Sequence, residues 1–85
     1  PSVEVGMGEF LGAYEEAITL LERLLLEYPD SPLAQSPYVY NRLGTLYSQI
    51  YLPESAKAAF EEAFKLAIPD SEAARISEQA LEDLN

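Results

Sequence analysis

The chain contains no cysteine and no histidine. Disulfides, thiolate nucleophiles and cysteine-based metal sites are therefore excluded. The missing histidine removes the side chain that most often serves as a general base or as a metal ligand. Because cysteine usage is the usual indicator of the redox compartment, the compartment stays open, and we expect a soluble domain of either the cytoplasm or the periplasm.

Basic residues are scarce as well. Five lysines and arginines stand against 15 aspartates and glutamates, which gives a formal net charge of −10. This balance argues against nucleic acid and against an anionic membrane surface as partners. It is compatible with a basic partner protein, but it favours an acidic surface that serves only solubility, including solubility in salt.

Long apolar runs are also missing. No apolar run exceeds three residues, the length of Leu24–Leu26, and this is far too short to cross a membrane, so we expect no membrane insertion. A length of 85 residues predicts one small domain over residues 1–85. The chain begins at Pro1 without an initiator methionine, and we therefore expect it to be a fragment of a larger protein. Residues 1–8 contain two glycines and little periodicity, which predicts a loose entry.

Apolar residues recur at three- and four-residue steps and predict an all-α fold with four main helices, at about 9–28, 37–51, 53–67 and 71–84. Prolines mark the boundaries, and Ser36-Pro37 combines an N-cap residue with a proline at the first helical position. Residues 29–36 are predicted to form an extended connection. Ser31-Pro32 offers the same start signal earlier, so this connection could contain a short helical turn.

The second predicted helix has two faces when its residues are placed about 100° apart. Its apolar face holds Tyr40, Leu43, Tyr47, Ile50 and Tyr51. Gly44 flanks this face, where a missing side chain would let a neighbouring helix approach closely. The opposite face is polar and consists of Tyr38, Asn41, Arg42, Thr45, Ser48 and Gln49.

The third and fourth predicted helices each carry a narrower apolar stripe. Alanines and two phenylalanines form the third stripe, at positions 56, 59, 60, 63, 64 and 67. Ala73, Ile76, Ala80 and Leu84 form the fourth, under a charged outer side. One thin apolar stripe is typical of a terminal capping helix.

The sequence contains an internal repeat. Pro29-Asp30-Ser31 recurs as Pro69-Asp70-Ser71, and residues 14–17 parallel residues 53–56 at a 39-residue shift. A period in the high thirties with helical units indicates an α-solenoid, in which antiparallel helix pairs stack on one another.

The residues of this unit resemble the tetratricopeptide repeat (TPR). The resemblance covers residues 37–69 and rests on an aromatic, Leu-Gly and an aromatic on one helix, Ala, an aromatic and Ala on the next, and a closing proline. These positions are Tyr40, Leu43, Gly44, Tyr47, Ala56, Phe60, Ala63 and Pro69. Residues 9–29 resemble the second helix of a preceding unit, so the resemblance implies half a repeat, one full repeat and a capping helix. The Tyr-Pro-Asp-Ser-Pro motif is similar to TPR units in bacterial cell-envelope assembly proteins.

The resemblance implies a scaffold for protein–protein interaction. TPR units hold an extended peptide in a concave groove lined by the first helix of each unit, and that lining corresponds here to Tyr38, Asn41, Arg42, Thr45, Ser48 and Gln49. Helical geometry selects the same polar face independently. TPR proteins that hold the carboxylate tails of chaperones use several basic and amide residues across three repeats, whereas this chain offers only Asn41 and Arg42.

Two of these residues allow a second interpretation. Tyr38 could anchor a partner or cover the preceding helix, and Arg42 could hold a carboxylate of a partner or pair with a nearby glutamate. The whole module has an alternative function too. Homo-oligomerisation could cover an incomplete solenoid end near Phe10, Leu11 and Tyr14, because about three stacked units are usually needed for stability.

No catalytic residue, metal site or cofactor is predicted. The adjacent carboxylates Glu15-Glu16 and Glu61-Glu62 point about 100° apart on a helix, so neither pair converges on one atom. We therefore do not expect an enzyme.

Overall fold

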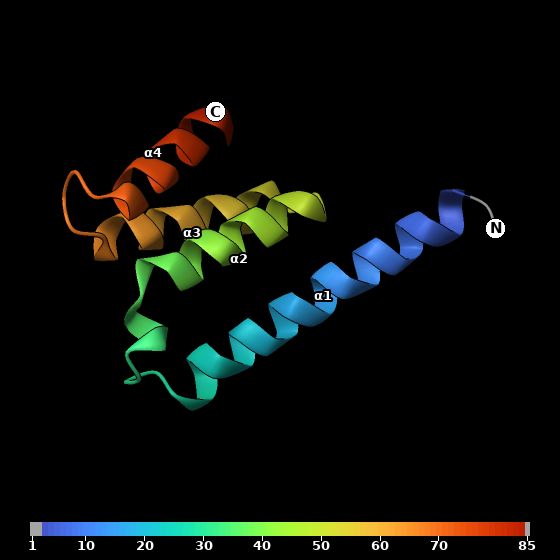
Figure 1. Cartoon of the computed structure of the whole chain (residues 1–85), viewed down its shortest axis with the longest axis horizontal. Helices are drawn as coiled ribbons and strands as arrows, with labels where there is room; N and C mark the ends of the chain where they lie inside the picture. Colours follow the sequence, from blue (N-terminus) through green and yellow to red (C-terminus); the bar gives the residue numbers. More distant parts are fainter. Residues whose placement is uncertain (1–2, 85) are drawn as a thin grey trace.

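The computed structural model describes residues 3–84, and residues 3–10 only as backbone. Within that range the chain forms α1 (Val3–Glu27), the 3₁₀ helix η1 (Leu33–Gln35), α2 (Pro37–Gln49), α3 (Pro53–Leu66) and α4 (Glu72–Leu84), without a strand (Figure 1). The prediction of an all-α fold with four main helices is confirmed. The predicted ends of the second and third helices lie one or two residues beyond the observed ones.

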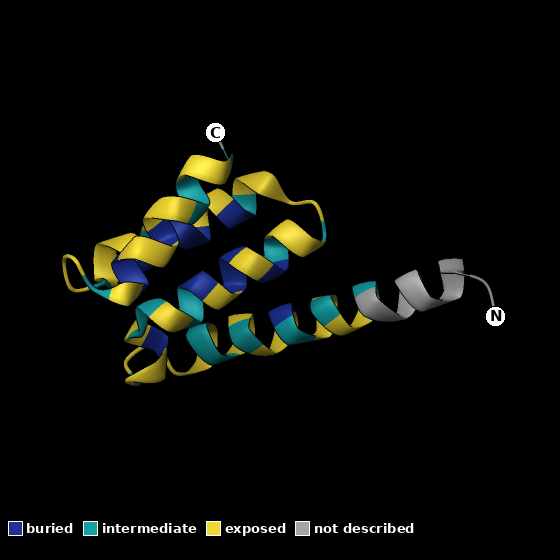
Figure 2. Ribbon diagram, turned by 45° about the horizontal axis from the view of Figure 1, so that its top comes forward, coloured by how far each residue is buried: buried dark blue, intermediate teal, exposed yellow. Residues whose placement is uncertain are grey.

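Helix α2 lies at the centre of the packing. It forms an antiparallel hairpin with α3, while α1 and α4 pack against other sides of it (Figure 1). The core joins α1, α2 and α3 through Ile18, Leu43, Leu46 and Ala59. Figure 2 shows the buried positions on the facing sides of these helices. Leu46 belongs to this core although the sequence prediction left it out of the apolar face.

The predicted loose entry is wrong for residues 3–8, because α1 already begins at Val3. Gly12 lies inside α1 and does not interrupt it. A glycine inside a helix costs about 1 kcal/mol relative to alanine, which is too little to end a helix of 25 residues. Residues 1 and 2 lie outside the described range.

The connection between α1 and α2 contains η1, as the Ser31-Pro32 start signal allowed. This helical turn stops at Ser36 because a residue before proline is pushed out of the α region. Ser36 is extended, with φ −83° and ψ 129°, and its Oγ accepts a hydrogen bond of 3.2 Å from the Tyr38 N–H. The predicted N-cap of α2 is confirmed.

The two Pro-Asp-Ser turns share their hydrogen bonds as well as their residues. The N–H groups of Ser31 and Ser71 donate to the carbonyl three residues before, at 3.1 and 3.0 Å. Their Oγ atoms accept from Ala34 N–H and Ala74 N–H, at 3.2 Å in both turns. Both alanines are buried. The internal repeat is thus a repeat of local structure.

Gly44 brings α2 and α3 into close contact. A Cβ built on Gly44 would lie 2.7 Å from Cε1 and Cζ of the buried Phe60 ring. No described glycine has a positive φ. Glycine is therefore required at position 44 because a side chain would not fit, and not because of its backbone conformation. The packing role predicted for Gly44 is confirmed.

Three predicted core positions are wrong, since Tyr51, Phe64 and Ile76 are 81%, 47% and 40% exposed. Tyr51 follows the end of α2 and turns outward. In α4 the buried face holds Ala73, Ala74 and Ser77, so it is rotated from the predicted stripe. Small side chains let α4 approach its neighbours closely, and the bulkier Ile76 stays at the edge of the contact.

Candidate partner-binding surface

Four of the six predicted site residues form one exposed stripe on α2. Tyr38, Arg42, Thr45 and Gln49 follow one another at intervals of three or four residues, and all are exposed. The Tyr38 side chain has 55% of its surface exposed. Because α1, α3 and α4 pack against other sides of α2, this stripe, hereafter the α2 stripe, is the side of the helix that the described chain leaves uncovered.

Asn41 is not part of the exposed surface, so its assignment as an exposed contact is wrong. It is 6% exposed, and its Nδ2 donates a hydrogen bond of 3.2 Å to the carbonyl of Ala73 on α4. On the helical wheel Asn41 lies roughly 70° from the α2 stripe, toward α4. Its Oδ1 is buried and has no hydrogen-bond partner within the described residues. Asn41 therefore links α2 to α4 and fixes α4 beside the α2 stripe.

The hydroxyl groups of the predicted site are partly engaged. Thr45 donates to the Asn41 carbonyl at 3.1 Å, and Ser48 donates to the Gly44 carbonyl at 3.0 Å. Their oxygens can still accept a hydrogen bond from a ligand, but their protons are held inside the helix. Ser48 is exposed on the side of a shallow pocket of about 360 Å³, which it lines together with Tyr51, Pro53 and Leu84.

Arg42 supplies the positive charge of the α2 stripe. It is one of five basic residues in a chain with 15 acidic ones, and its side chain is exposed at the middle of the stripe. A guanidinium can bind a carboxylate through two parallel hydrogen bonds. The stripe therefore combines an aromatic ring, a bidentate cation and a side-chain amide along one line.

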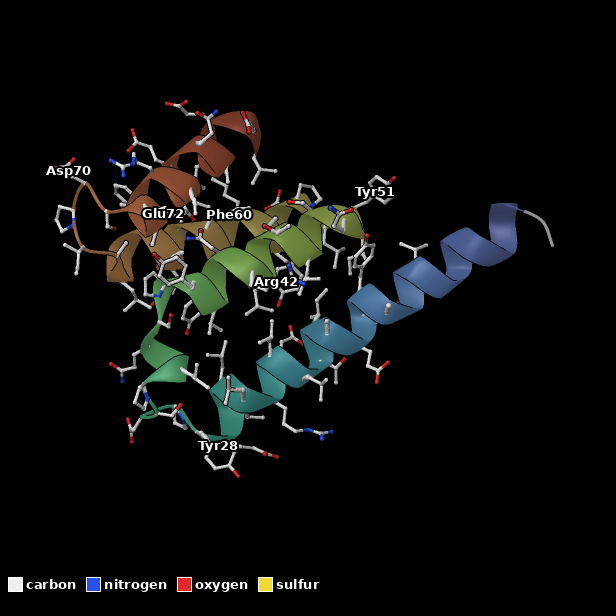
Figure 3. The ribbon with its side chains drawn as sticks, in the orientation of Figure 1. Tyr28, Arg42, Tyr51, Phe60, Asp70 and Glu72 are labelled. Carbon is white, nitrogen blue, oxygen red and sulfur yellow. The ribbon has the colours of Figure 1, made fainter. Side chains whose placement is uncertain are left out.

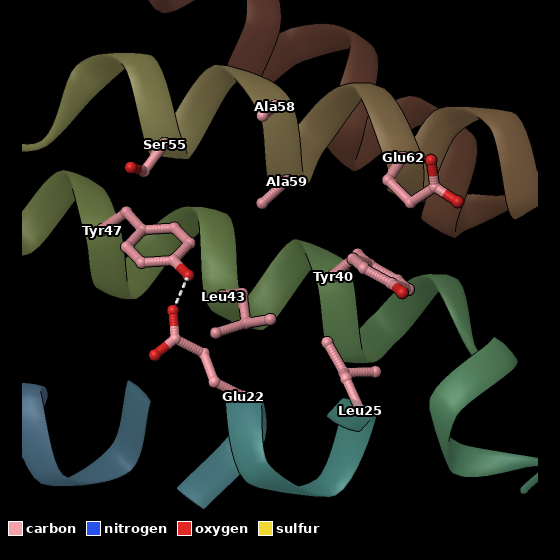
Figure 4. Close-up of a pocket in the computed structure, with 9 residues that line it drawn as sticks. All are labelled: Glu22, Leu25, Tyr40, Leu43, Tyr47, Ser55, Ala58, Ala59 and Glu62. Carbon is pink, nitrogen blue, oxygen red and sulfur yellow. Dashed lines mark hydrogen bonds between the residues drawn. The ribbon is translucent and has the colours of Figure 1, made fainter. Parts of the chain in front are cut away.

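A groove of about 290 Å³ lies on the other side of α2, between α1 and α3 (Figure 4). Its floor consists of Tyr40, Leu43 and Tyr47, which lie on the wheel almost opposite the α2 stripe. Sequence analysis placed the two tyrosines in the core, and they are in fact partly buried. The groove itself was missed, because three helices build it and their spacing is not readable from one helix face.

A hydrogen bond joins the α1 wall of this groove to its floor. The Tyr47 hydroxyl donates a hydrogen bond to the carboxylate Oε2 of Glu22 on α1. Burial of Tyr47, together with the hydrogen bond and the negative charge of Glu22, raises the pKa of Tyr47 to about 12. The phenol is protonated at neutral pH, as tyrosines generally are, and its hydrogen bond orients the Glu22 carboxylate at the groove.

The described residues offer neither a candidate metal centre nor a candidate membrane span. They contain no group of three or more acidic side chains that could hold a metal ion, in a chain that has no histidine or cysteine. They also contain no helix that is both long and apolar enough to span a membrane.

Comparisons with protein-family models, with curated proteins and with solved structures returned no match for this chain. The interpretation of the surface therefore rests on its own geometry.

Proposed function

We propose that this chain is a TPR-like protein-interaction module that binds a segment of a partner protein along the α2 stripe. The observation that carries the proposal is the uncovered line of Tyr38, Arg42, Thr45 and Gln49 on a helix whose other sides are packed. A surface helix enclosed by three neighbours is a rigid platform, and rigid platforms bind peptides with less loss of conformational entropy.

The hairpin supports the TPR-like part of the proposal. Gly44 leaves room for the Phe60 ring. The Leu-Gly position thus permits the close approach of two helices that such a repeat requires. The shared hydrogen bonds at Ser31 and Ser71 support a repeating unit. Helix α4 takes the position of the next unit's first helix, beside α2 and against α3.

The size and chemistry of the α2 stripe suggest the kind of segment it binds. Gln49 follows Tyr38 by eleven positions, which corresponds to about 16 Å of helix and to about five residues of an extended peptide. Arg42 would pair with a carboxylate of the segment, and the Tyr38 ring would cover an apolar side chain. Exposed Tyr and Arg are the residue types that most often dominate binding energies.

A peptide selection tests the proposal. Random dodecapeptides displayed on phage would be enriched on the immobilised chain, and the best binder measured by isothermal titration calorimetry. We expect Tyr38→Ala/Arg42→Ala to weaken binding at least tenfold, because it removes the ring and the cation together. Asn41 is left unchanged, since its replacement would disturb the contact with α4.

The control removes the same two residue types elsewhere. Arg23 and Tyr28 are exposed on or just after α1, away from the α2 stripe. Arg23→Ala/Tyr28→Ala should change the dissociation constant by no more than about twofold if the stripe is the binding surface. Equal effects of the two double variants, at unchanged helicity by circular dichroism, would contradict the assignment.

Homo-oligomerisation is the second candidate function, and one observation favours it at a place other than the predicted end near Phe10, Leu11 and Tyr14. The side chain of Phe10 lies outside the described residues, and Tyr14 packs against the core. Leu20, Leu24 and Tyr28 follow one another at four-residue steps on the flank of α1, and Leu20 and Tyr28 remain 58% and 60% exposed. A second copy could cover this flank, as a preceding helix would in a longer solenoid.

Sedimentation equilibrium separates this candidate from a monomeric module. If the flank of α1 mediates dimers, Leu20→Glu should shift the chain to monomers, whereas Leu26→Glu should not. Leu26 is a suitable control because it is 82% exposed and lies on a different side of α1. A wild-type chain that stays monomeric at all concentrations would rule this candidate out.

A further inference from the structure

The groove between α1 and α3 has the chemistry of a site for a positively charged side chain. Its floor is apolar and aromatic, with Leu43 between the rings of Tyr40 and Tyr47 (Figure 4). The α3 wall is low, because Ala58 and Ala59 contribute only methyl groups. A long aliphatic chain can therefore lie along the floor without displacing a protein side chain.

Two carboxylates stand at opposite ends of the groove. Glu22 of α1 lies at the Tyr47 end, and Glu62 of α3 lies nearer the Tyr40 end (Figure 4). The hydrogen bond from Tyr47 fixes the Glu22 carboxylate in place. The residues that line the groove include no basic side chain to neutralise these charges.

The side chains of arginine and lysine fit both the apolar floor and the two carboxylates. Their aliphatic stems pack on apolar surface while the charged ends reach outward. The charged end can then form a charge-assisted hydrogen bond with a carboxylate and lie against a tyrosine face. The net charge of −10 would also attract a basic segment over a longer range and speed its association.

We propose that this groove docks a basic segment of a partner protein, in which arginine or lysine alternates with aliphatic residues. The site is separate from the α2 stripe, because the groove floor lies almost opposite the stripe on the helical wheel of α2. One α2 helix would thus carry two docking surfaces of different chemistry.

A defined peptide tests the proposal. The probe is a fluorescein-labelled octapeptide of alternating leucine and arginine, titrated with the full chain and followed by fluorescence anisotropy at low salt. We expect Glu22→Gln/Glu62→Gln to weaken binding about tenfold, since both carboxylates are lost while the shape is kept. An octapeptide of alternating leucine and glutamate should not bind.

A matched variant separates the groove from general charge attraction. Glu16→Gln/Glu61→Gln removes two charges from exposed positions on the same two helices, outside the groove. It should change the affinity by no more than about twofold. Ala58→Trp keeps the charge and fills the groove from the exposed α3 wall, and it should abolish binding at unchanged helicity.

The outcomes are distinguishable. Equal losses of affinity in the two glutamine variants, or full binding by Ala58→Trp, would overturn the proposal that the groove binds the peptide. Only non-specific charge attraction between the peptide and the chain would then remain. Loss of binding in Tyr38→Ala/Arg42→Ala but not in the groove variants would place the octapeptide on the α2 stripe and also overturn the proposal. If amide NMR signals of the groove shift when the unliganded chain is concentrated, a second copy occupies the groove instead.

Discussion

At the scale of single residues, two glycines inside helices have opposite surroundings. Apart from its own helix backbone and chain neighbours, Gly12 has no described atom within 4 Å of the place where a Cβ would be, whereas the Cβ of a residue at Gly44 would lie 2.7 Å from the Phe60 ring. Phe60 is buried, so it cannot move aside freely. There is therefore room for a side chain at position 12 but not at position 44.

We predict that Gly44→Ala lowers the free energy of unfolding by about 1–2 kcal/mol, because overpacking outweighs the gain in helix propensity. Gly12→Ala should raise it by up to about 1 kcal/mol, since propensity acts there without a clash. Urea denaturation followed by circular dichroism measures both. A stabilising Gly44→Ala would show that α2 and α3 are not in the close contact described.

The hydrogen bond from Tyr47 to Glu22 predicts a pH dependence of stability. The pKa of Tyr47 is raised from 10.0 to about 12 in the folded chain. Below pH 10 the folded and unfolded chains both hold this proton, and the contribution to stability is complete. Between about pH 10 and 12 the unfolded chain loses the proton first, so stability falls as the pH rises.

Ultraviolet titration at 295 nm measures this ionisation directly. The difference between the wild type and Tyr47→Phe should show a phenolate that forms near pH 12. Tyr47→Phe should also remove the loss of stability that the group contributes between pH 10 and 12. A difference curve centred at pH 10 would contradict the hydrogen bond to Glu22.

At the scale of elements, the end of α2 carries an unusual cap. The Leu52 N–H donates to the Tyr47 carbonyl and the Tyr51 N–H donates to the Ser48 carbonyl, at 2.9 and 3.2 Å. This pair of bonds is a Schellman motif. Tyr51 occupies its left-handed position, with φ 62°, where glycine is usual.

Tyr51→Gly should therefore stabilise the chain by about 0.5–1 kcal/mol, because it relieves the left-handed strain of a residue with a Cβ and loses little packing. The ring of Tyr51 is 81% exposed, so its removal is of small consequence. Tyr51→Ala is the control, since it removes the ring and keeps the Cβ, and it should not stabilise. Thermal unfolding of the three chains gives the comparison.

The elements also show how far sequence reasoning reaches. Helix boundaries follow local chemistry, so the proline positions and the Ser36 cap predicted them well. The start of α1 at Val3 was not predicted, because the glycines near the N-terminus interrupt the apolar periodicity in the sequence. The same glycines cost the helix only about 1 kcal/mol each relative to alanine, which is too little to end it.

The candidate site shows the same division. Tyr38, Arg42, Thr45 and Gln49 were predicted on an exposed face because the period of one helix is enough to group them. The burial of Asn41 could not be predicted, because it depends on the side from which α4 packs. The groove was beyond prediction for a similar reason, since it exists only where α1 and α3 leave a space over α2.

At the scale of the whole molecule, the chain is elongated, with principal extents of 46 × 31 × 19 Å and a radius of gyration of 13.8 Å. Helix α2 packs against α1, α3 and α4. It exposes the α2 stripe on one side and contributes the floor of the groove on the other. Side chains reach solvent from every helix, and Figure 3 shows Arg42 among them on α2. A partner on one surface of α2 would leave the opposite surface accessible.

The central claim is that the α2 stripe binds a partner segment, and an NMR titration tests it most directly. The ¹⁵N-labelled chain would be titrated with the dodecapeptide selected on the wild type, and the amide shifts mapped. We predict the largest shifts at Tyr38, Arg42, Thr45 and Gln49, and small ones at Glu22, Tyr47 and Glu62. Largest shifts on α1 or in the groove, with the α2 stripe unchanged, would contradict the account.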